Sequence, residues 1–180
     1  APVCAASTGR WSGTVIDCNS RNRRYLALWL PFLSTERIKR LAHRAGGRRD
    51  DLPIVVAALE ANAMRLVAAD PKALSLGLRP GLGLADARAR VPVIEVHEHE
   101  PEADLALLRH FADWCDRYTP VVVEDAPDTL ILEVAGSLHL FGGETELCRD
   151  IEGRFAGFGF TVRTAIAGTS LCARAVARFD

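Results

Sequence analysis

The stretch YTPVVVEDAPDTLILEVAG, residues 118–136, decides the fold of this chain. Two runs rich in apolar and β-branched residues, 121–124 and 129–136, lie on either side of the tetrapeptide DAPD. Aspartate and proline favour turns, and apolar runs joined by a short turn are typical of neighbouring strands. The stretch therefore predicts an antiparallel β-hairpin.

Amphipathic helices are expected on both sides of this hairpin. Residues 101–118 and 143–159 place apolar side chains three and four positions apart, as one buried helix face requires. Strands are expected at 25–30, 93–96 and 161–167, and Ser170 is expected to open a last helix. We expect helices on one face of a mixed or antiparallel sheet, which is an α+β domain.

Residues 34–92 break this regular order. Ser34 is expected to cap a helix, residues 46–51 to form a basic loop, and residues 52–59 and 65–70 to form strands. The Gly/Pro-rich stretch 77–92 predicts a turn followed by a brief helix that Pro92 ends. Residues 1–22 show no helical or strand periodicity, and we expect them to be a disordered leader outside the fold.

Composition limits the classes of function. The 180 residues are 49% hydrophobic and 25% charged, with a formal net charge of −1, so any contact with nucleic acid must be local. The five cysteines are odd in number and lack CxxC spacing, which favours a reducing, cytoplasmic compartment over a disulfide framework or a zinc site. No stretch predicts a membrane span or an export signal.

Three segments together resemble the palm and fingers of Y-family translesion DNA polymerases. They are RRYLALWLPFL (23–33), GLRPGL (77–82) and the hairpin followed by FGG (141–143). The resemblance implies a ferredoxin-like palm formed by 23–33 and 93–180, and a small α/β fingers-like insertion at 34–92. It also implies that the thumb and little-finger domains are absent from this chain.

The residues that stand at the catalytic positions of that family differ from its motifs. On the first strand, Trp29 and Pro31 replace two metal-binding aspartates, and Leu33 replaces the aromatic steric gate. In the hairpin, Asp128 keeps its identity but Thr129 replaces the adjacent glutamate. The resemblance therefore implies one remnant carboxylate.

The nucleotide-binding and DNA-binding positions follow the same resemblance. Pro71 and Leu74 replace the tyrosine and arginine of the fingers, and the late lysine falls near Cys172. Arg79, in GLRPGL, retains its family identity and could contact a template phosphate or only solvate a loop. Arg48 and Arg49, in the basic loop, are the other candidate DNA contacts.

Electrostatics argues against phosphoryl transfer. Two divalent ions about 4 Å apart are needed, and hard carboxylate ligands must hold them. Their repulsion is ~16 kcal/mol at an effective dielectric of 20. Asp128 alone cannot offset it, so we expect no metal or other cofactor, and we expect the bulky Trp29 to block the old nucleotide pocket.

The pattern is similar to the ImuB family, the catalytically degenerate Y-family proteins of bacterial mutasomes. The resemblance implies a DNA-binding scaffold in damage-induced mutagenesis. Its implied partners are an error-prone C-family polymerase, a RecA-like accessory protein and the sliding clamp.

Two other functions stay open at this point. An atypical active polymerase would need Mg²⁺ held by Asp128 with Glu124, Asp125 or Glu133, although Glu133 should point to the opposite face of its strand. The chain could also be a small α+β protein-binding domain. HEHE (97–100) could suggest a metal site, but a solvated loop is favoured because a site needs three or four convergent ligands.

Overall fold

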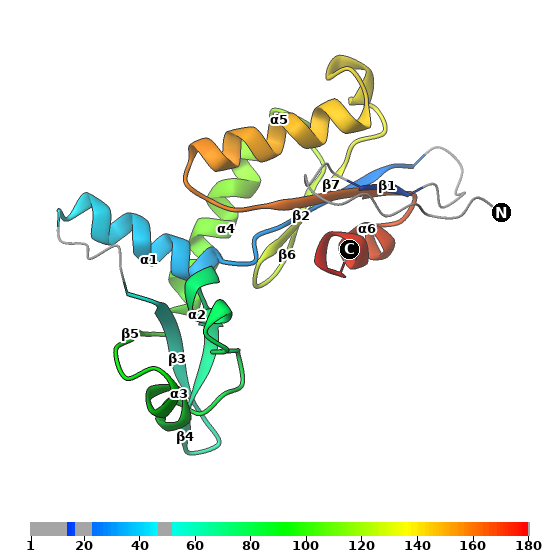
Figure 1. Cartoon of the computed structure of the whole chain (residues 1–180). Coiled ribbons are helices and arrows are strands. Elements are labelled where there is room, and N and C mark those ends of the chain that lie inside the picture. The colour runs from blue at the N-terminus through cyan, green and yellow to red at the C-terminus, as the bar shows by residue number, and fades with distance from the viewer. Residues whose placement is uncertain (1–13, 17–22, 47–51, 180) are drawn as a thin grey trace.

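The computed structural model describes residues 14–16, 23–46 and 52–179. It contains a five-stranded sheet and a three-stranded sheet, each with its own helices (Figure 1). Among the described residues, no helix is long and apolar enough to cross a membrane.

The larger sheet has the order β1-β8-β2-β7-β6. Its strands are β1 (Thr14–Ile16), β2 (Tyr25–Trp29), β6 (Val122–Asp125), β7 (Thr129–Glu133) and β8 (Arg163–Ala167). Neighbours among β8, β2, β7 and β6 run antiparallel, and helices α4 (Pro101–Cys115) and α5 (Glu144–Gly157) connect strands of this sheet. This is the ferredoxin-like β-α-β-β-α-β arrangement, and the predicted hairpin is confirmed as β6–β7.

Alternate residues of β2 point to opposite faces of the sheet, and both faces are covered. Leu26 and Leu28 pack in the main core with α4 and α5, whereas Ala27 packs with the apolar side of α6 (Ser170–Phe179). The expectation that helices cover one face is therefore wrong. Small side chains at Ala165 and Ala167 of β8 leave room for α6 on the second face.

The smaller sheet has the order β4-β3-β5. Strands β3 (Ile54–Glu60) and β4 (Ala63–Ala69) form a tight hairpin whose two loop residues, Ala61 and Asn62, have positive φ, as a type I′ turn requires. Strand β5 (Glu95–Glu98) pairs in parallel with β3. The predicted boundary at residue 93 is therefore too early, because β5 completes the sheet of the insertion.

Helices α2 (Pro71–Ser75) and α3 (Leu84–Arg90) belong to the same part of the chain, and Ala73 and Ala87 lie in its separate core. Sequence analysis missed α2, although Asp70 caps it and Pro71 stands at its first position. The brief helix ended by Pro92 is confirmed as α3.

Two expectations about the first 46 residues are corrected. Helix α1 (Leu33–Arg44) begins before Ser34, whose hydroxyl donates to Asp104 of α4 and does not cap the helix. Within the expected leader, β1 pairs in parallel with β8, so residues 14–16 are part of the fold. The other residues of that leader lie outside the described part of the chain.

A short 3-10 helix, η1 (Leu138–Leu140), follows the hairpin and leads into α5. At the start of α5, Glu144 accepts a charged hydrogen bond from Arg24, next to β2. This pair ties the end of the hairpin segment back to the beginning of the central strand.

Candidate functional site

The structure brings together the residues at the predicted catalytic positions. Trp29 at the end of β2 pairs directly with Thr129 at the start of β7, and Asp128 precedes Thr129 in the hairpin loop. The backbone N–H of Leu30 donates to the carbonyl of Asp128 at 2.8 Å, which holds the strand end against this loop. These contacts place one carboxylate, one indole and one hydroxyl together at the edge of the sheet where β2 ends and β7 begins.

Both carboxylate oxygens of Asp128 accept hydrogen bonds from side chains. The indole Nε1 of Trp29 donates to Oδ2 at 3.0 Å, and the hydroxyl of Thr129 donates to Oδ1 at 2.9 Å. Arg178 of α6 also donates to Oδ1 and forms an ion pair with it. Asp128 therefore has a compensated charge, and each of its oxygens accepts at least one hydrogen bond.

Two arginines of α6, one helical turn apart, hold the hairpin loop. Arg178 binds Asp128, and Arg174 lies 2.9 Å from Asp125. The guanidinium carbons of Arg178 and Arg163 also lie 5.7 Å and 5.6 Å from the centre of the Trp29 ring, within cation–π range. Sequence analysis did not identify Arg178, and the i, i+4 spacing of arginines on the last helix was the available signal.

A cavity of about 640 Å³ lies between the two sheets, beside these residues. Its wall is mainly apolar, from Trp29 to Leu33 on one side and Val67 to Ala69 on the other, with Asp104 and Asp128 as its acidic members. Trp29 forms part of the wall and does not fill the space, so the expected physical blockage is not what the structure contains. No lysine or arginine of the described residues lines this cavity.

The other nearby carboxylates also have basic partners. Asp104, which is 4% exposed, accepts hydrogen bonds from Ser34 and from Arg37 Nε, both at 2.6 Å. Glu124 lies 3.4 Å from Arg109. Asp104, Glu124, Asp125 and Asp128 are thus each matched to an arginine of the protein.

Histidines do not extend this set into a metal centre. His97 Nε2 contacts Glu95 of its own strand at 2.7 Å, and His99 Nε2 lies 4.0 Å from Asp104. In the parts of the chain that the structure describes, no three His, Cys, Asp or Glu side chains are grouped to hold a metal ion.

The three predicted nucleotide-binding positions are not brought together. Leu74 lines the cavity, Pro71 begins α2 outside it, and Cys172 lies on α6, packed against the alanine-rich cluster on the second face of the sheet. These side chains offer a triphosphate neither a cation nor a phenol hydroxyl.

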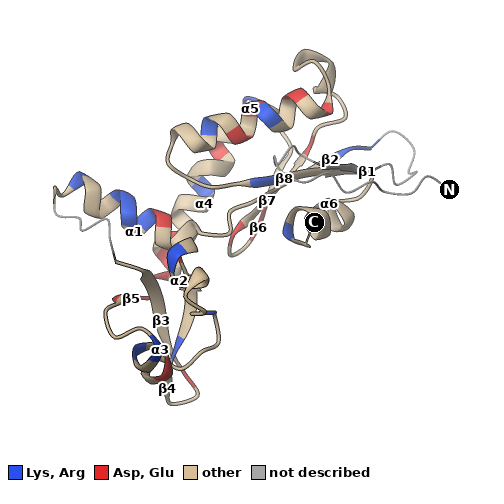
Figure 2. Ribbon diagram, viewed as in Figure 1, with Lys and Arg blue, Asp and Glu red and all other residues tan. Residues whose placement is uncertain are grey.

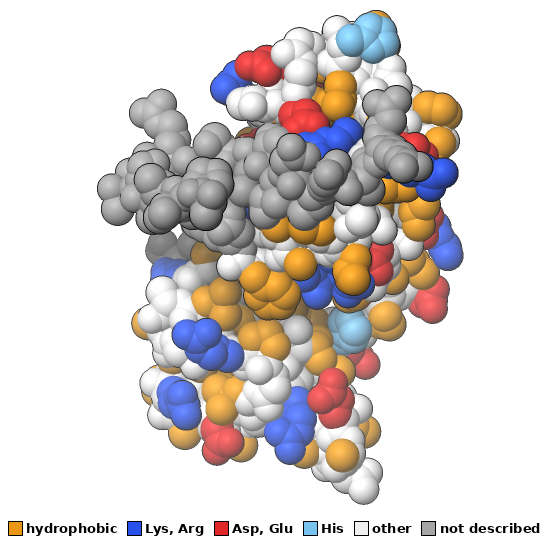
Figure 3. Space-filling model, turned by 90° about the vertical axis from the view of Figure 1, so that its right-hand side faces the viewer, with side chains coloured by type: hydrophobic (Ala, Val, Ile, Leu, Met, Phe, Trp, Pro, Cys, Tyr) orange, Lys and Arg blue, Asp and Glu red, His pale blue; other side chains and the backbone are white. Residues whose placement is uncertain are grey.

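The candidate DNA contacts can be placed in part. Arg79 is exposed in the loop between α2 and α3, next to Pro80, which lines the cavity. This loop is held to β4 by Gly81 N–H donating to the Leu66 carbonyl at 2.7 Å, and Gly81 adopts a φ of 89°. Arg48 and Arg49 lie outside the described residues. In Figure 3 basic side chains stand singly among acidic and apolar ones, so a DNA contact on this face would be local.

The ferredoxin-like sheet, the small inserted sheet and the cavity between them define a class of protein. The fold is that of the palm and fingers region of Y-family DNA polymerases. It matches the crystal structure of DinB from Sulfolobus solfataricus with a TM-score of 0.71, and a post-insertion binary complex of Dbh DNA polymerase with a TM-score of 0.75. Both matches have 16% sequence identity and cover 86% of this chain and 45% of the solved chain.

Residues 43–178 match the model of the impB/mucB/samB family, and the chain belongs to that family. It is also 44% identical, over 104 residues, to Protein ImuB from two strains of Caulobacter vibrioides. That alignment covers 58% of this chain and 23% of the relative, so the chain spans only part of the proteins it resembles.

Proposed function

We propose that this chain is the palm and fingers part of a non-catalytic Y-family homologue, which binds DNA as a scaffold subunit in error-prone translesion synthesis. The observation that carries the proposal is the state of Asp128. Trp29, Thr129 and Arg178 use both of its oxygens, at the point where the polymerases of this fold are expected to hold metal ions.

The residue types around Asp128 support the absence of nucleotidyl transfer. Trp29 and Pro31 have no side-chain oxygen to offer a divalent ion, which takes carboxylate, carbonyl or water ligands. A metal at Asp128 would first have to displace the guanidinium of Arg178, which already neutralises the carboxylate.

The charge of the cavity supports the same conclusion for the nucleotide. A triphosphate carries several negative charges, and the cavity lining offers two aspartates and no lysine or arginine from the described residues. Transfer of phosphate charge into an apolar space without cations is strongly unfavourable. A nucleotide is therefore rejected by the chemistry of the wall, although the space itself is open.

The similarity to Protein ImuB extends the proposal to partners. A scaffold of this kind would act beside an error-prone C-family polymerase, a RecA-like accessory protein and the sliding clamp. Arg79 on the fingers loop, with Arg48 and Arg49, would supply phosphate contacts to DNA.

Primer extension by the full-length protein tests the loss of catalysis. It is measured with Mg²⁺ and then Mn²⁺, on damaged and undamaged templates, beside an active Y-family polymerase. We expect no extension under conditions in which the control extends, while the protein still binds the primer–template. Incorporation that disappears in Asp128→Ala would overturn the proposal, because it would make Asp128 a metal ligand.

Salt-dependent DNA binding tests the other half of the proposal. Phosphate contacts release counterions, so the affinity for a primer–template should fall steeply as the salt concentration rises. A protein that binds no DNA at low salt would instead be a protein-binding domain without a nucleic-acid role.

A further inference from the structure

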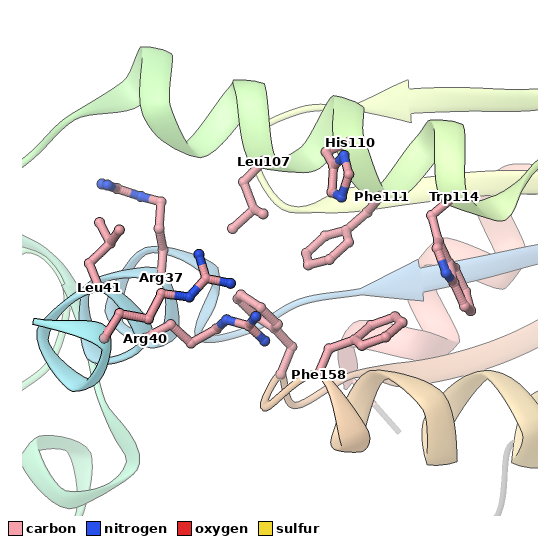
Figure 4. A pocket seen from close by; sticks show the side chains of 10 residues that line it. Arg37, Arg40, Leu41, Leu107, His110, Phe111, Trp114 and Phe158 are labelled. Carbon is pink, nitrogen blue, oxygen red and sulfur yellow. The ribbon is translucent and has the colours of Figure 1, made fainter.

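A second cavity, of about 390 Å³, lies away from the former nucleotide cleft. Helix α1, helix α4 and the loop after α5 enclose it, on the side of the larger sheet that α4 and α5 cover (Figure 4). Helices α1 and α4 line the nucleotide cleft with Ser34 and Asp104, but they line this cavity with residues further along each helix. The two cavities are therefore separate surfaces.

Aromatic side chains give the second cavity a fixed floor. The ring of Phe111 lies 4.9 Å from those of both Phe155 and Phe160, and Trp114 meets Phe158 edge-on at 5.2 Å. Because these rings belong to or pack against the main core, the floor exists before any ligand arrives. A preformed apolar floor lowers the ordering entropy that binding would otherwise require.

Helix α1 carries several basic residues (Figure 2), and its arginines make the cavity rim basic on this side. Arg40 and Arg44 stand one turn apart, with the half-exposed Leu41 beside them. Neither arginine forms an ion pair with a carboxylate of the described residues, although Arg40 lies over the Phe160 ring. Arg37 is different, because Asp104 and Glu100 neutralise it.

The geometry of the rings argues against a nucleic-acid base as the occupant. Base recognition of this kind uses an open aromatic face for stacking. The guanidinium carbon of Arg117 lies 3.9 Å from the centre of the Trp114 ring and covers one of its faces, and Phe111 and Phe160 are almost completely buried. The floor can receive an apolar side chain from above, but it offers no free ring face to a base.

We propose that this cavity docks an acidic peptide segment of a partner protein, which inserts one aromatic or leucine side chain between α1 and α4. The carboxylates that flank the inserted side chain pair with Arg40 and Arg44, and Leu41 extends the apolar contact at the rim. Charge complementarity supports this occupant, because the rim has two cations without acidic partners and no acidic lining residue in the described part of the chain. The proposal does not depend on the loss of catalysis, since none of these residues touches the former nucleotide cleft.

The test uses labelled heptapeptides and fluorescence anisotropy with the complete 180-residue chain. Each peptide has three acidic residues on either side of a central Phe, Trp, Leu or Ser. We expect the peptides with an apolar centre to bind more tightly than the Ser peptide, by about tenfold for burial of one large side chain. The combined change Arg40→Glu and Arg44→Glu should weaken their binding about tenfold, and Leu41→Asp should weaken it in the same direction.

Arg149→Glu is the matched control, because Arg149 is an exposed arginine of α5 outside the cavity. It should change the affinity by less than about twofold. Thermal unfolding of each variant verifies that the fold is kept. We expect it to be kept, because the side chains of Arg44 and Leu41 are exposed.

Three outcomes would overturn the proposal. One is equal binding of the Ser peptide and the apolar peptides, and another is binding that the double arginine variant leaves unchanged. The last is that the double arginine variant and Leu41→Asp weaken the binding of a different occupant instead. That occupant would be a single-stranded oligo-dT or a second copy of the chain, the latter detected by sedimentation.

Discussion

Replacing Asp128 with alanine should lower the free energy of unfolding by about 2 kcal/mol. Breaking a fully buried ion pair costs about 3–5 kcal/mol and an exposed one about 0–1 kcal/mol. The side chains of Arg178 and Asp128 are 24% and 26% exposed, so their pair falls between these limits. The same change removes the acceptor of the Trp29 indole N–H.

The environment of Arg178 sets the sign of this effect. Its Nε is buried without a hydrogen-bond partner in the described residues, so the bond to Asp128 offsets much of the cost of burying the guanidinium. A carboxylate kept only for a metal would give the opposite sign, because its removal relieves repulsion among acidic groups when metal is absent.

Thermal and urea unfolding measure this difference. A loss of about 2 kcal/mol corresponds to a fall in Tm of about 4–8 °C for a domain of this size. Asp113→Ala, an exposed aspartate on α4, should change the free energy by less than about 0.5 kcal/mol. The reasoning is refuted when Asp128→Ala is as stable as the parent or more stable. It is also refuted when millimolar Mg²⁺ raises the Tm of the parent but not that of Asp128→Ala.

Four further predictions concern the buried cysteines, Asp104 and Arg79. Burial raises the pKa of the Cys115 thiol to about 12 and that of Cys148 to about 11, so peptide mapping after iodoacetamide treatment at pH 8.5 should find both unmodified in the native protein and modified in urea. Their ordinary pKa is 9.0, so the stability they contribute is complete below pH 9 and is lost as the pH rises toward these values, which alkaline unfolding curves would reveal. Asp104→Ala should destabilise the protein by about 3 kcal/mol in urea unfolding, because it leaves buried Arg37 with one acceptor at the exposed Glu100; an effect below about 1 kcal/mol would contradict this. Arg79→Ala should reduce the slope of log affinity for DNA against log salt by about 1, and an unchanged slope would mean that Arg79 only solvates its loop.

Local signals in the sequence were sufficient for most elements of the fold. The hairpin of β6 and β7 was predictable because its apolar runs and its turn residues agree, and α4 and α5 were predictable from their regular apolar spacing. The Asp70-Pro71 pair is a comparable local signal for α2, because it combines an N-cap with a first-turn proline.

Elements that depend on distant partners could not be predicted in the same way. Strand β1 has only three residues, and its pairing with Ala165, Ile166 and Ala167 joins segments about 150 positions apart. The sequence of β5 is compatible with either sheet, because an apolar alternation does not specify the neighbouring strand. Its pairing with β3 is therefore visible only in three dimensions.

The candidate site also has a part that could be predicted from the sequence and a part that depends on distant segments. The resemblance to Y-family motifs singled out Trp29, Asp128 and Thr129 from the sequence, and the structure brings them together because β2 pairs with β7. The spacing of the arginines on α6 marks Arg178 as a candidate but does not name Asp128 as its partner, since only packing against the small alanines of the second sheet face brings the two together. The open cavity beside Trp29 was likewise unpredictable, because it depends on where the inserted sheet stands.

The bond network of Asp128 also has an evolutionary consequence. A Trp29→Asp change would bring a second negative charge beside Asp128 and remove an indole that donates to it and contacts two arginines. Arg178 would meanwhile continue to occupy the position that a cation would need. A metal site at this strand end would thus require several simultaneous substitutions, because the strand end, the hairpin loop and α6 share one network of contacts.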